Sequence, residues 1–146
     1  MTNQEYTDLL KQAFSTEYAF YLKAQNFHWN VTGYLFPQYH EFFGHIYEEV
    51  GGCLDAFAEN LRTKMIVVPA SFQQLEALSA IKGQDTAISG MKMCEELLAD
   101  SDLCIELFKT AYQMAESTAD YGLANFLAER QSQHEKHSWQ LMSTLS

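Results

Sequence analysis

Residues 26–62, "NFHWNVTGYLFPQYHEFFGHIYEEVGGCLDAFAENLR", contain the pattern that decides the fold. Beyond Gly33 and Pro37, apolar side chains recur at steps of three, four or seven residues, the spacing of one face of an α-helix. This spacing predicts a helix from about Gln38 to Met65, whose apolar stripe consists of Phe43, Ile46, Val50, Leu54, Phe57 and Leu61. The same stretch contains four side chains of types that bind metals: His28, His40, Asp55 and Glu59.

The flanking sequence continues the helical pattern. Thr2 and Glu5 form a capping-box motif at the start of a first helix that extends to about His28. After Pro69 a long connection runs to about residue 83, and Ser71 begins a short helix within it. Apolar spacing predicts a third helix around residues 88–112 and a fourth from about residue 120 to 141. We therefore predict one all-α domain, residues 1–146, that forms a ferritin-like four-helix bundle with a long crossover between helices 2 and 3 carrying the short helix.

Composition limits the classes of function. The chain has 9 Lys and Arg against 19 Asp and Glu, a net charge of -10, which disfavours nucleic acid and anionic membranes and suits cations. The first residues lack the pattern of a signal peptide, and no apolar run has the length of a membrane helix. The three cysteines form no CxxC pair. We expect a cytoplasmic protein with reduced cysteines and no membrane segment.

Helix geometry prevents one chain from bringing the four metal-binding side chains together. His40 and Asp55 are fifteen residues apart on one predicted helix, which places them about 22 Å apart along its axis. Metal–ligand bonds are only about 2 Å long. Taking His40 as zero, Asp55 lies at about 60° and Glu59 at about 100° around the helix, whereas the apolar stripe lies near 260–280°. These side chains therefore point away from the chain's own core.

A two-fold dimer with antiparallel second helices would solve this geometric problem. The histidines of one chain would then meet the carboxylates of its partner, and symmetry would repeat the site. Gly51 and Gly52, in the middle of the helix, each cost about 1 kcal/mol relative to alanine. Close approach of the two chains or a kink in the helix would account for them.

A metal site inside the bundle is not indicated. The ferritin-like carboxylate sites use Glu-x-x-His within one bundle, and no Glu in this chain has a His three positions later. His45, His134 and His137 are interpreted as structural residues, and the "HEKH" segment at residues 134–137 as a solvated or interface patch rather than a metal site.

The motifs "NFHWNVTG", "HEFF" and "DAFAENLR", together with "LANFLAERQSQHEKHSWQL" in the last helix, resemble those of the Dps-type mini-ferritins, the "DNA-binding protein from starved cells" family. The resemblance implies a hollow dodecamer that oxidises Fe2+ to Fe3+ between subunits, preferably with hydrogen peroxide rather than oxygen, and stores ferric mineral. It implies that His28 and His40 are ligands from one subunit and Asp55 and Glu59 from its partner. Trp29 would lie beside the site. Two imidazoles with two carboxylates would also suit zinc.

Gly44 departs from the family pattern, which has an acidic residue four positions after the second histidine. Glycine offers no side-chain ligand. The alternative to a working ferroxidase is therefore a metal-binding cage in which oxidation is impaired or absent.

Two further departures concern iron passage and DNA. The family lines three-fold pores with acidic residues near the start of the last helix; Asp120 matches one position, Asn125 replaces an Asp, and Glu129 adds negative charge. A nucleoid structural role, the third hypothesis, is disfavoured because the acidic chain shows no cluster of Lys and Arg.

Overall fold

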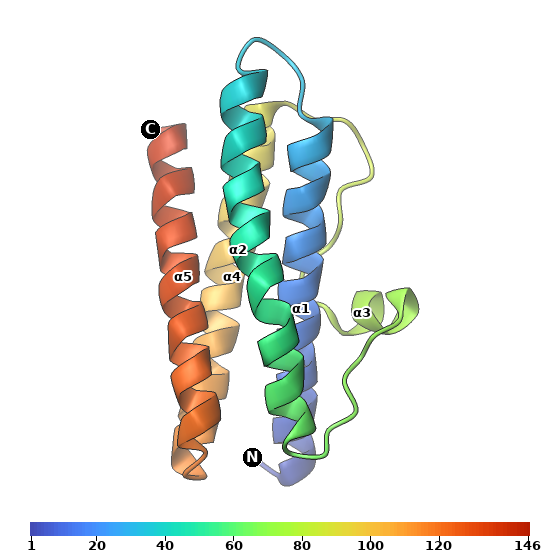
Figure 1. Ribbon diagram of the computed structural model, residues 1–146, viewed down its shortest axis with the longest axis vertical. Coiled ribbons are helices and arrows are strands. Elements are labelled where there is room, and N and C mark those ends of the chain that lie inside the picture. The colour runs from blue at the N-terminus through green and yellow to red at the C-terminus, as the bar shows by residue number, and fades with distance from the viewer.

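The computed structural model describes residues 1–146 and consists of five helices. They are α1 (Asn3–Asn30), α2 (Phe36–Arg62), α3 (Phe72–Leu78), α4 (Gly90–Ser117) and α5 (Tyr121–Leu145). The four long helices lie side by side as a bundle, and α3 stands outside it beside α1 (Figure 1). The predicted all-α bundle with a short helix in its crossover is confirmed.

The long connection between α2 and α4 gives the bundle its topology. It returns along the length of the molecule, so α2 and α4 run in the same direction and α1 and α5 in the opposite one (Figure 1). Lys23 of α1, which is 6% exposed, holds this connection by donating to the Lys82 carbonyl at 3.0 Å. Its ammonium also forms ion pairs with Glu96 at 3.0 Å and Asp100 at 2.8 Å on α4. One buried cation therefore joins α1, the crossover and α4.

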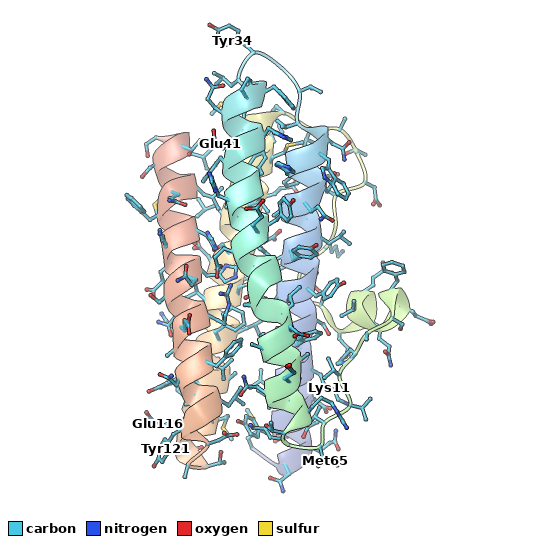
Figure 2. All side chains as sticks on the ribbon, in the orientation of Figure 1. Lys11, Tyr34, Glu41, Met65, Glu116 and Tyr121 are labelled. Carbon is cyan, nitrogen blue, oxygen red and sulfur yellow. The ribbon has the colours of Figure 1, made fainter.

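Local signals explain where the helices begin and end. The capping box of Thr2 and Glu5 is formed, and Ser71 caps α3 by accepting from the Gln74 amide. Helix α2 begins at Phe36, two residues before the predicted start, because Pro37 lies in the first turn, where its missing N–H is not needed. It ends before the predicted Met65, whose φ of 62° lies in the left-handed region. Met65 is exposed at the end of the bundle opposite Tyr34 (Figure 2).

The core is apolar and rich in aromatic rings. Its largest fully buried side chains include Phe20, Phe27, Phe43, Phe57 and Phe108. The cysteines form no disulfide, as expected, and two of them are buried in this core. None of the helices combines the length and hydropathy of a membrane-spanning segment.

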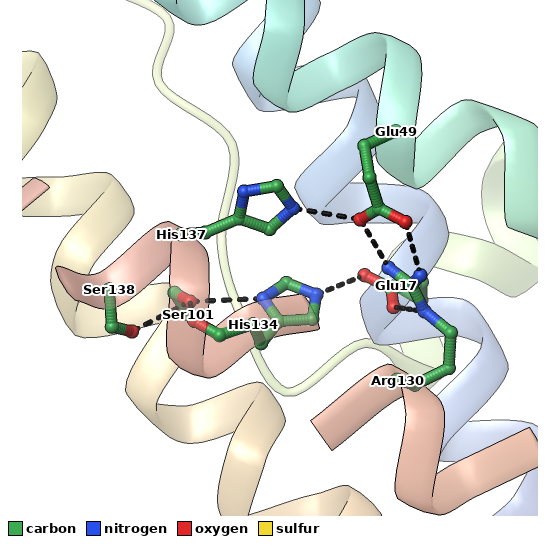
Figure 3. Close-up of polar contacts among 7 residues, drawn as sticks. All are labelled: Glu17, Glu49, Ser101, Arg130, His134, His137 and Ser138. Carbon is green, nitrogen blue, oxygen red and sulfur yellow. Dashed lines mark hydrogen bonds and ion pairs between the residues drawn. The ribbon is translucent and has the colours of Figure 1, made fainter. Parts of the chain in front are cut away.

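A polar cluster interrupts the core between α1, α2 and α5. We call it the buried ion cluster: Glu17, Glu49, Arg130, His134 and His137 (Figure 3). Arg130 donates to Glu17 at 3.1 Å and, through two nitrogens, to Glu49 at 2.6 and 2.9 Å. His134 donates to Glu17 at 2.7 Å and His137 to Glu49 at 2.8 Å. Each carboxylate thus binds the shared guanidinium and one imidazole, so three helices are joined by charge.

The cluster keeps its carboxylates ionised. Burial by itself would raise the pKa of Glu17, but His134 and Arg130 outweigh it and hold that pKa below its ordinary value. Burial also opposes ionisation of Glu49, yet the hydrogen bonds from His137 and Arg130 lower its pKa to about 2. The folded state is therefore stabilised at neutral pH by groups that acid would neutralise.

The interpretation of His134 and His137 as structural residues agrees with their hydrogen bonds to Glu17 and Glu49, but the interpretation of "HEKH" as a solvated or interface patch is wrong for both. His134 is fully buried and His137 is 5% exposed, whereas the Glu and Lys between them are exposed. Their helix, α5, has a continuous inward stripe at steps of three and four: Leu123, Leu127, Arg130, His134, His137 and Leu141. This spacing was visible in the sequence. The spacing alone does not show that polar side chains are tolerated inside the bundle, because their partners, Glu17 and Glu49, are far away in the chain.

Replacing Glu49 by Gln tests the pH dependence of the cluster. Because the folded pKa of Glu49 lies near 2, below the ordinary value of 4.5, its stabilisation is present above about pH 5 and lost as the pH falls towards 2. We expect Glu49→Gln to lower the free energy of unfolding by about 3 kcal/mol at pH 7. Urea unfolding measured from pH 7 to 2.5 should show this difference shrinking with acidification.

Glu106→Gln is the matched control, because Glu106 is 74% exposed and pairs only with Lys109. Its stability should follow the wild type across the same range. A Glu49→Gln difference that stays constant down to pH 2.5 would show that the carboxylate charge is not what stabilises the bundle.

Candidate metal centre

His28 and His40 lie together at one end of the bundle. His28 is in the last turn of α1, His40 is in the second turn of α2, and the short connection between these helices brings the residues into contact. Their rings stack with centroids 3.8 Å apart and an interplanar angle of 14°. The Phe36 ring also stacks on His40, with the ring centroids 4.9 Å apart. The predicted histidine pair is therefore formed within one chain.

Reciprocal hydrogen bonds fix the orientation of both imidazoles. Nδ1 of His28 lies 2.5 Å from the His40 carbonyl oxygen, and Nδ1 of His40 lies 2.6 Å from the His28 carbonyl oxygen. A carbonyl oxygen can only accept, so each Nδ1 carries the proton. In the neutral rings each Nε2 then has a free lone pair. A hydrogen bond from the other ring nitrogen to a carbonyl is how metal-binding histidines are usually held.

Gly44 has a packing role at this pair. A Cβ atom at position 44 would lie 3.0 Å from both Nδ1 and Cε1 of His28, closer than such contacts normally are. The absence of a side chain on α2 thus makes room for the imidazole from α1. Local sequence patterns do not explain this glycine, since the contact joins Gly44 of α2 to His28 of α1, sixteen positions earlier.

The predicted carboxylate ligands lie elsewhere on α2. The helix is continuous from Phe36 to Arg62, so the rise of an α-helix places Asp55 about 22 Å from His40 along the axis. Asp55 and Glu59 are both exposed, in contrast to the buried residues of the same helix. The structure therefore brings the two histidines together and leaves both carboxylates apart from them within one chain.

The glycines near the middle of α2 have different surroundings. A Cβ at Gly51 would lie 2.7 Å from Cε1 of Tyr21, so this glycine accommodates a ring of the same chain. Gly52 is exposed and has no such neighbour within 4 Å. Packing against Tyr21 of the same chain therefore accounts for Gly51, and close approach of a partner chain is not needed to explain this glycine.

Large apolar side chains are exposed on α1 and α3. Trp29, next to His28, is 61% exposed; Leu22, seven residues earlier on α1, is 46% exposed, and Phe72 of α3 is 86% exposed. Leu22 and Phe72 line one open groove of about 760 Å³ between α1 and α3. Exposed apolar surface of this kind is typical of a protein–protein interface.

The residues predicted to line a pore lie near the N-terminal end of α5. Asp120 caps α5 by accepting from the Leu123 amide, and its carboxylate forms an ion pair with Lys64 at 2.9 Å. Asn125 and Glu129 are exposed. Lys64 neutralises part of the negative charge that Asp120 would contribute to steering cations.

Glu17, Cys104 and His134 form a second group of metal-binding residue types, with one donor atom of each within 4.8 Å of the others. All three are buried. Glu17, however, already has one oxygen bound to His134 and the other to Arg130. Burial raises the pKa of the Cys104 thiol well above its ordinary value, which disfavours the thiolate that binds metals. Arg130 supplies the positive charge here, so this group does not fit a metal ion.

Comparison with known proteins agrees with this architecture. The family model described as a Ferritin-like domain matches residues 7–146. The DNA protection during starvation protein of Brevibacillus brevis is 31% identical over 142 residues, covering 94% of this chain and 92% of that protein. A crystal structure of a Dps protein from Bacillus brevis covers all of both chains with 28% identity and a TM-score of 0.92. The structure of Dps from Thermosynechococcus elongatus, at 23% identity, shows the same fold with a TM-score of 0.93. With its five helices in the same arrangement, the chain belongs to the ferritin-like proteins and, within them, to the Dps-type mini-ferritins.

Proposed function

We propose that this protein stores and detoxifies iron as a hollow homo-oligomeric cage, a dodecamer built from two-fold dimers. Ferrous iron binds between subunits, hydrogen peroxide or oxygen oxidises it, and the ferric product is stored inside. Membership of the family supports a role in iron storage and protection in general. The observation that carries the site is the histidine pair, with both Nδ1 atoms tied to carbonyl oxygens and both Nε2 atoms free to bind a metal.

The partner subunit supplies the carboxylates in this proposal. Asp55 and Glu59 are exposed and too far along α2 to join the histidines of their own chain. An antiparallel two-fold arrangement of α2 helices places each acidic pair beside the other chain's imidazoles. The exposed apolar side chains of α1 and α3 supply surface for such contacts. Zinc is a competing occupant of this ligand set.

Gly44 distinguishes two versions of this function. Without an acidic side chain at position 44, the site has fewer ligands for a second metal ion. The alternative to a ferroxidase is a cage that binds and stores metal but does not accelerate oxidation. Anaerobic Fe2+ titration followed by separate peroxide and oxygen pulses distinguishes these versions, since both predict binding and only the ferroxidase predicts fast oxidation.

Subunit complementation tests the shared site. His28→Ala and Asp55→Ala should each abolish saturable Fe2+ binding, because every site in either variant lacks one ligand. In a mixed dimer of the two variants, one site carries both substitutions and the other carries neither. We therefore expect co-expressed, doubly tagged assemblies to regain binding, up to one intact site per mixed dimer.

Mixing His28→Ala with His40→Ala is the matched control, because both substitutions remove imidazoles and every site in the mixed dimer keeps one of them. No recovery is expected. If His28→Ala and Asp55→Ala assemblies also fail to recover binding although they form mixed dimers, the ligands do not come from two chains.

Gly44→Ala tests whether the glycine positions His28. The added methyl group pushes the imidazole by a few tenths of an ångström and so strains its hydrogen bond to the His40 carbonyl. Loss of such orienting contacts typically lowers metal affinity 10–100-fold, and we expect a loss of about tenfold or more in Fe2+ affinity by anaerobic titration. The fold should be retained, because alanine is favoured over glycine in a helix by about 1 kcal/mol.

Gly122→Ala on α5 is the control for helix propensity, since a Cβ there meets nothing within 4 Å. Its affinity should be unchanged. Unchanged affinity in Gly44→Ala would mean that His28 moves freely; Gly44→Asp should then supply the missing ligand and accelerate oxidation.

DNA retention is not expected of the purified protein. Nineteen acidic residues against nine basic ones repel a polyanion, although three relatives are named for DNA protection or DNA binding. A gel shift at low micromolar protein and physiological salt should show no complex, with a basic DNA-binding protein as the positive control. A shifted band that weakens with salt would instead support a nucleoid role.

A further inference from the structure

A row of tyrosine rings leads away from the histidine pair along the contact between α1 and α2. The Tyr47 ring lies 5.1 Å from that of His28, centroid to centroid. Tyr21 lies 5.9 Å from Tyr47, and Tyr18 lies 5.8 Å from Tyr21. All three tyrosines are half-buried. Tyrosine and tryptophan are among the side chains that most readily give up one electron. The row therefore connects the candidate metal centre to a series of side chains that can act as electron donors.

The packing of α1 on α2 holds this row in place. Gly44 and Gly51 are seven residues apart on α2, and their partners His28 and Tyr21 are seven residues apart on α1. Each glycine lets a ring lie directly on the α2 backbone. Tyr47, between the two glycines in sequence, fills the space between these rings and contacts both. Gly44 and Gly51 therefore make room for the His28 and Tyr21 rings, because neither glycine has a side chain that would collide with them.

The electron count of the proposed reaction creates a need for such a donor. Hydrogen peroxide accepts two electrons when its O–O bond breaks, whereas one Fe2+ ion gives only one. A centre that holds two ferrous ions meets this need by itself. With glycine at position 44, the second ion lacks an acidic side-chain ligand, so a single bound ion must find its second electron elsewhere.

We propose that Tyr47 supplies this second electron, an inference that rests on the proposed function. The balanced step is Fe2+ + H2O2 + Tyr47–OH → Fe3+ + Tyr47–O• + OH− + H2O. The O–O bond and the phenol O–H bond break, iron and tyrosine each lose one electron, and the phenol proton leaves in the water molecule. No free hydroxyl radical is released.

A second ferrous ion restores the tyrosine. Its oxidation follows Tyr47–O• + Fe2+ + H2O → Tyr47–OH + Fe3+ + OH−. The two steps together oxidise two ferrous ions per peroxide, with the tyrosine regenerated. Tyr21, next in the row, can share the oxidised state with Tyr47 because their rings are in contact.

Rapid freeze-quench EPR tests the proposal. The assembled protein is loaded anaerobically with one Fe2+ per site, mixed with one equivalent of peroxide and frozen within milliseconds. We expect a tyrosyl radical whose spectrum narrows when the protein contains ring-deuterated tyrosine. The signal should be lost in Tyr47→Phe, which keeps the ring contacts, and retained in the control Tyr112→Phe, whose hydroxyl contacts Glu116 on α4.

The stoichiometry gives an independent readout. Wild-type protein should oxidise two ferrous ions per peroxide, and Tyr47→Phe should move towards one ion per peroxide with hydroxyl radical appearing in a spin trap. Fe2+ affinity, measured before peroxide is added, should be the same in both. A radical that resists tyrosine deuteration and disappears in Trp29→Phe would assign the donor to the exposed indole and overturn the proposal.

Failure of the donor role differs from failure of the proposed function. Normal Fe2+ binding and two-to-one oxidation in both wild type and Tyr47→Phe, without a tyrosyl radical, would overturn the donor role alone. Absence of Fe2+ binding in the wild type would overturn the proposed function and the donor role with it.

Discussion

The fixed rise of the α-helix is the constraint on which the arrangement of this protein depends. Because α2 continues without a break from Phe36 to Arg62, residues at its two ends cannot approach each other. A set of ligands divided between these ends is useless to an isolated chain. In the proposed function these residues form a centre only when a second chain runs alongside in the opposite direction. Under that proposal, the separation of His40 from Asp55 is by itself a structural reason for assembly, independent of any apolar surface.

The sequence was sufficient for the parts of the structure that depend on local spacing. Helix positions, the capping box at Thr2 and the inward stripe of α2 all follow from residues a few positions apart. The pairing of His28 with His40 came from the family resemblance, and in the structure the short connection between α1 and α2 brings the two rings into contact. The separation of the carboxylates from this pair could be predicted from the number of residues between them and the rise of an α-helix.

What could not be predicted depends on contacts between distant segments. The interior position of His134 requires Glu17, which comes more than a hundred residues earlier. The spacing of α5 would have allowed a polar residue inside the bundle, but charge is normally excluded from a core without a partner, and the partner was not identifiable. Gly44 posed the same difficulty. The His28 imidazole occupies the space that a side chain at position 44 would need. Counting the metal ligands along the sequence does not reveal this contact.

Arg130 has a consequence for the order of events in the cell. Many small metal-binding proteins fold only when their ion arrives, so their abundance follows the supply of that ion. Here a covalently attached cation already balances Glu17 and Glu49 at the centre of the bundle. The chain can therefore reach its final shape in iron-starved conditions. In the proposed storage role, the fold would therefore be complete before ferrous iron is present.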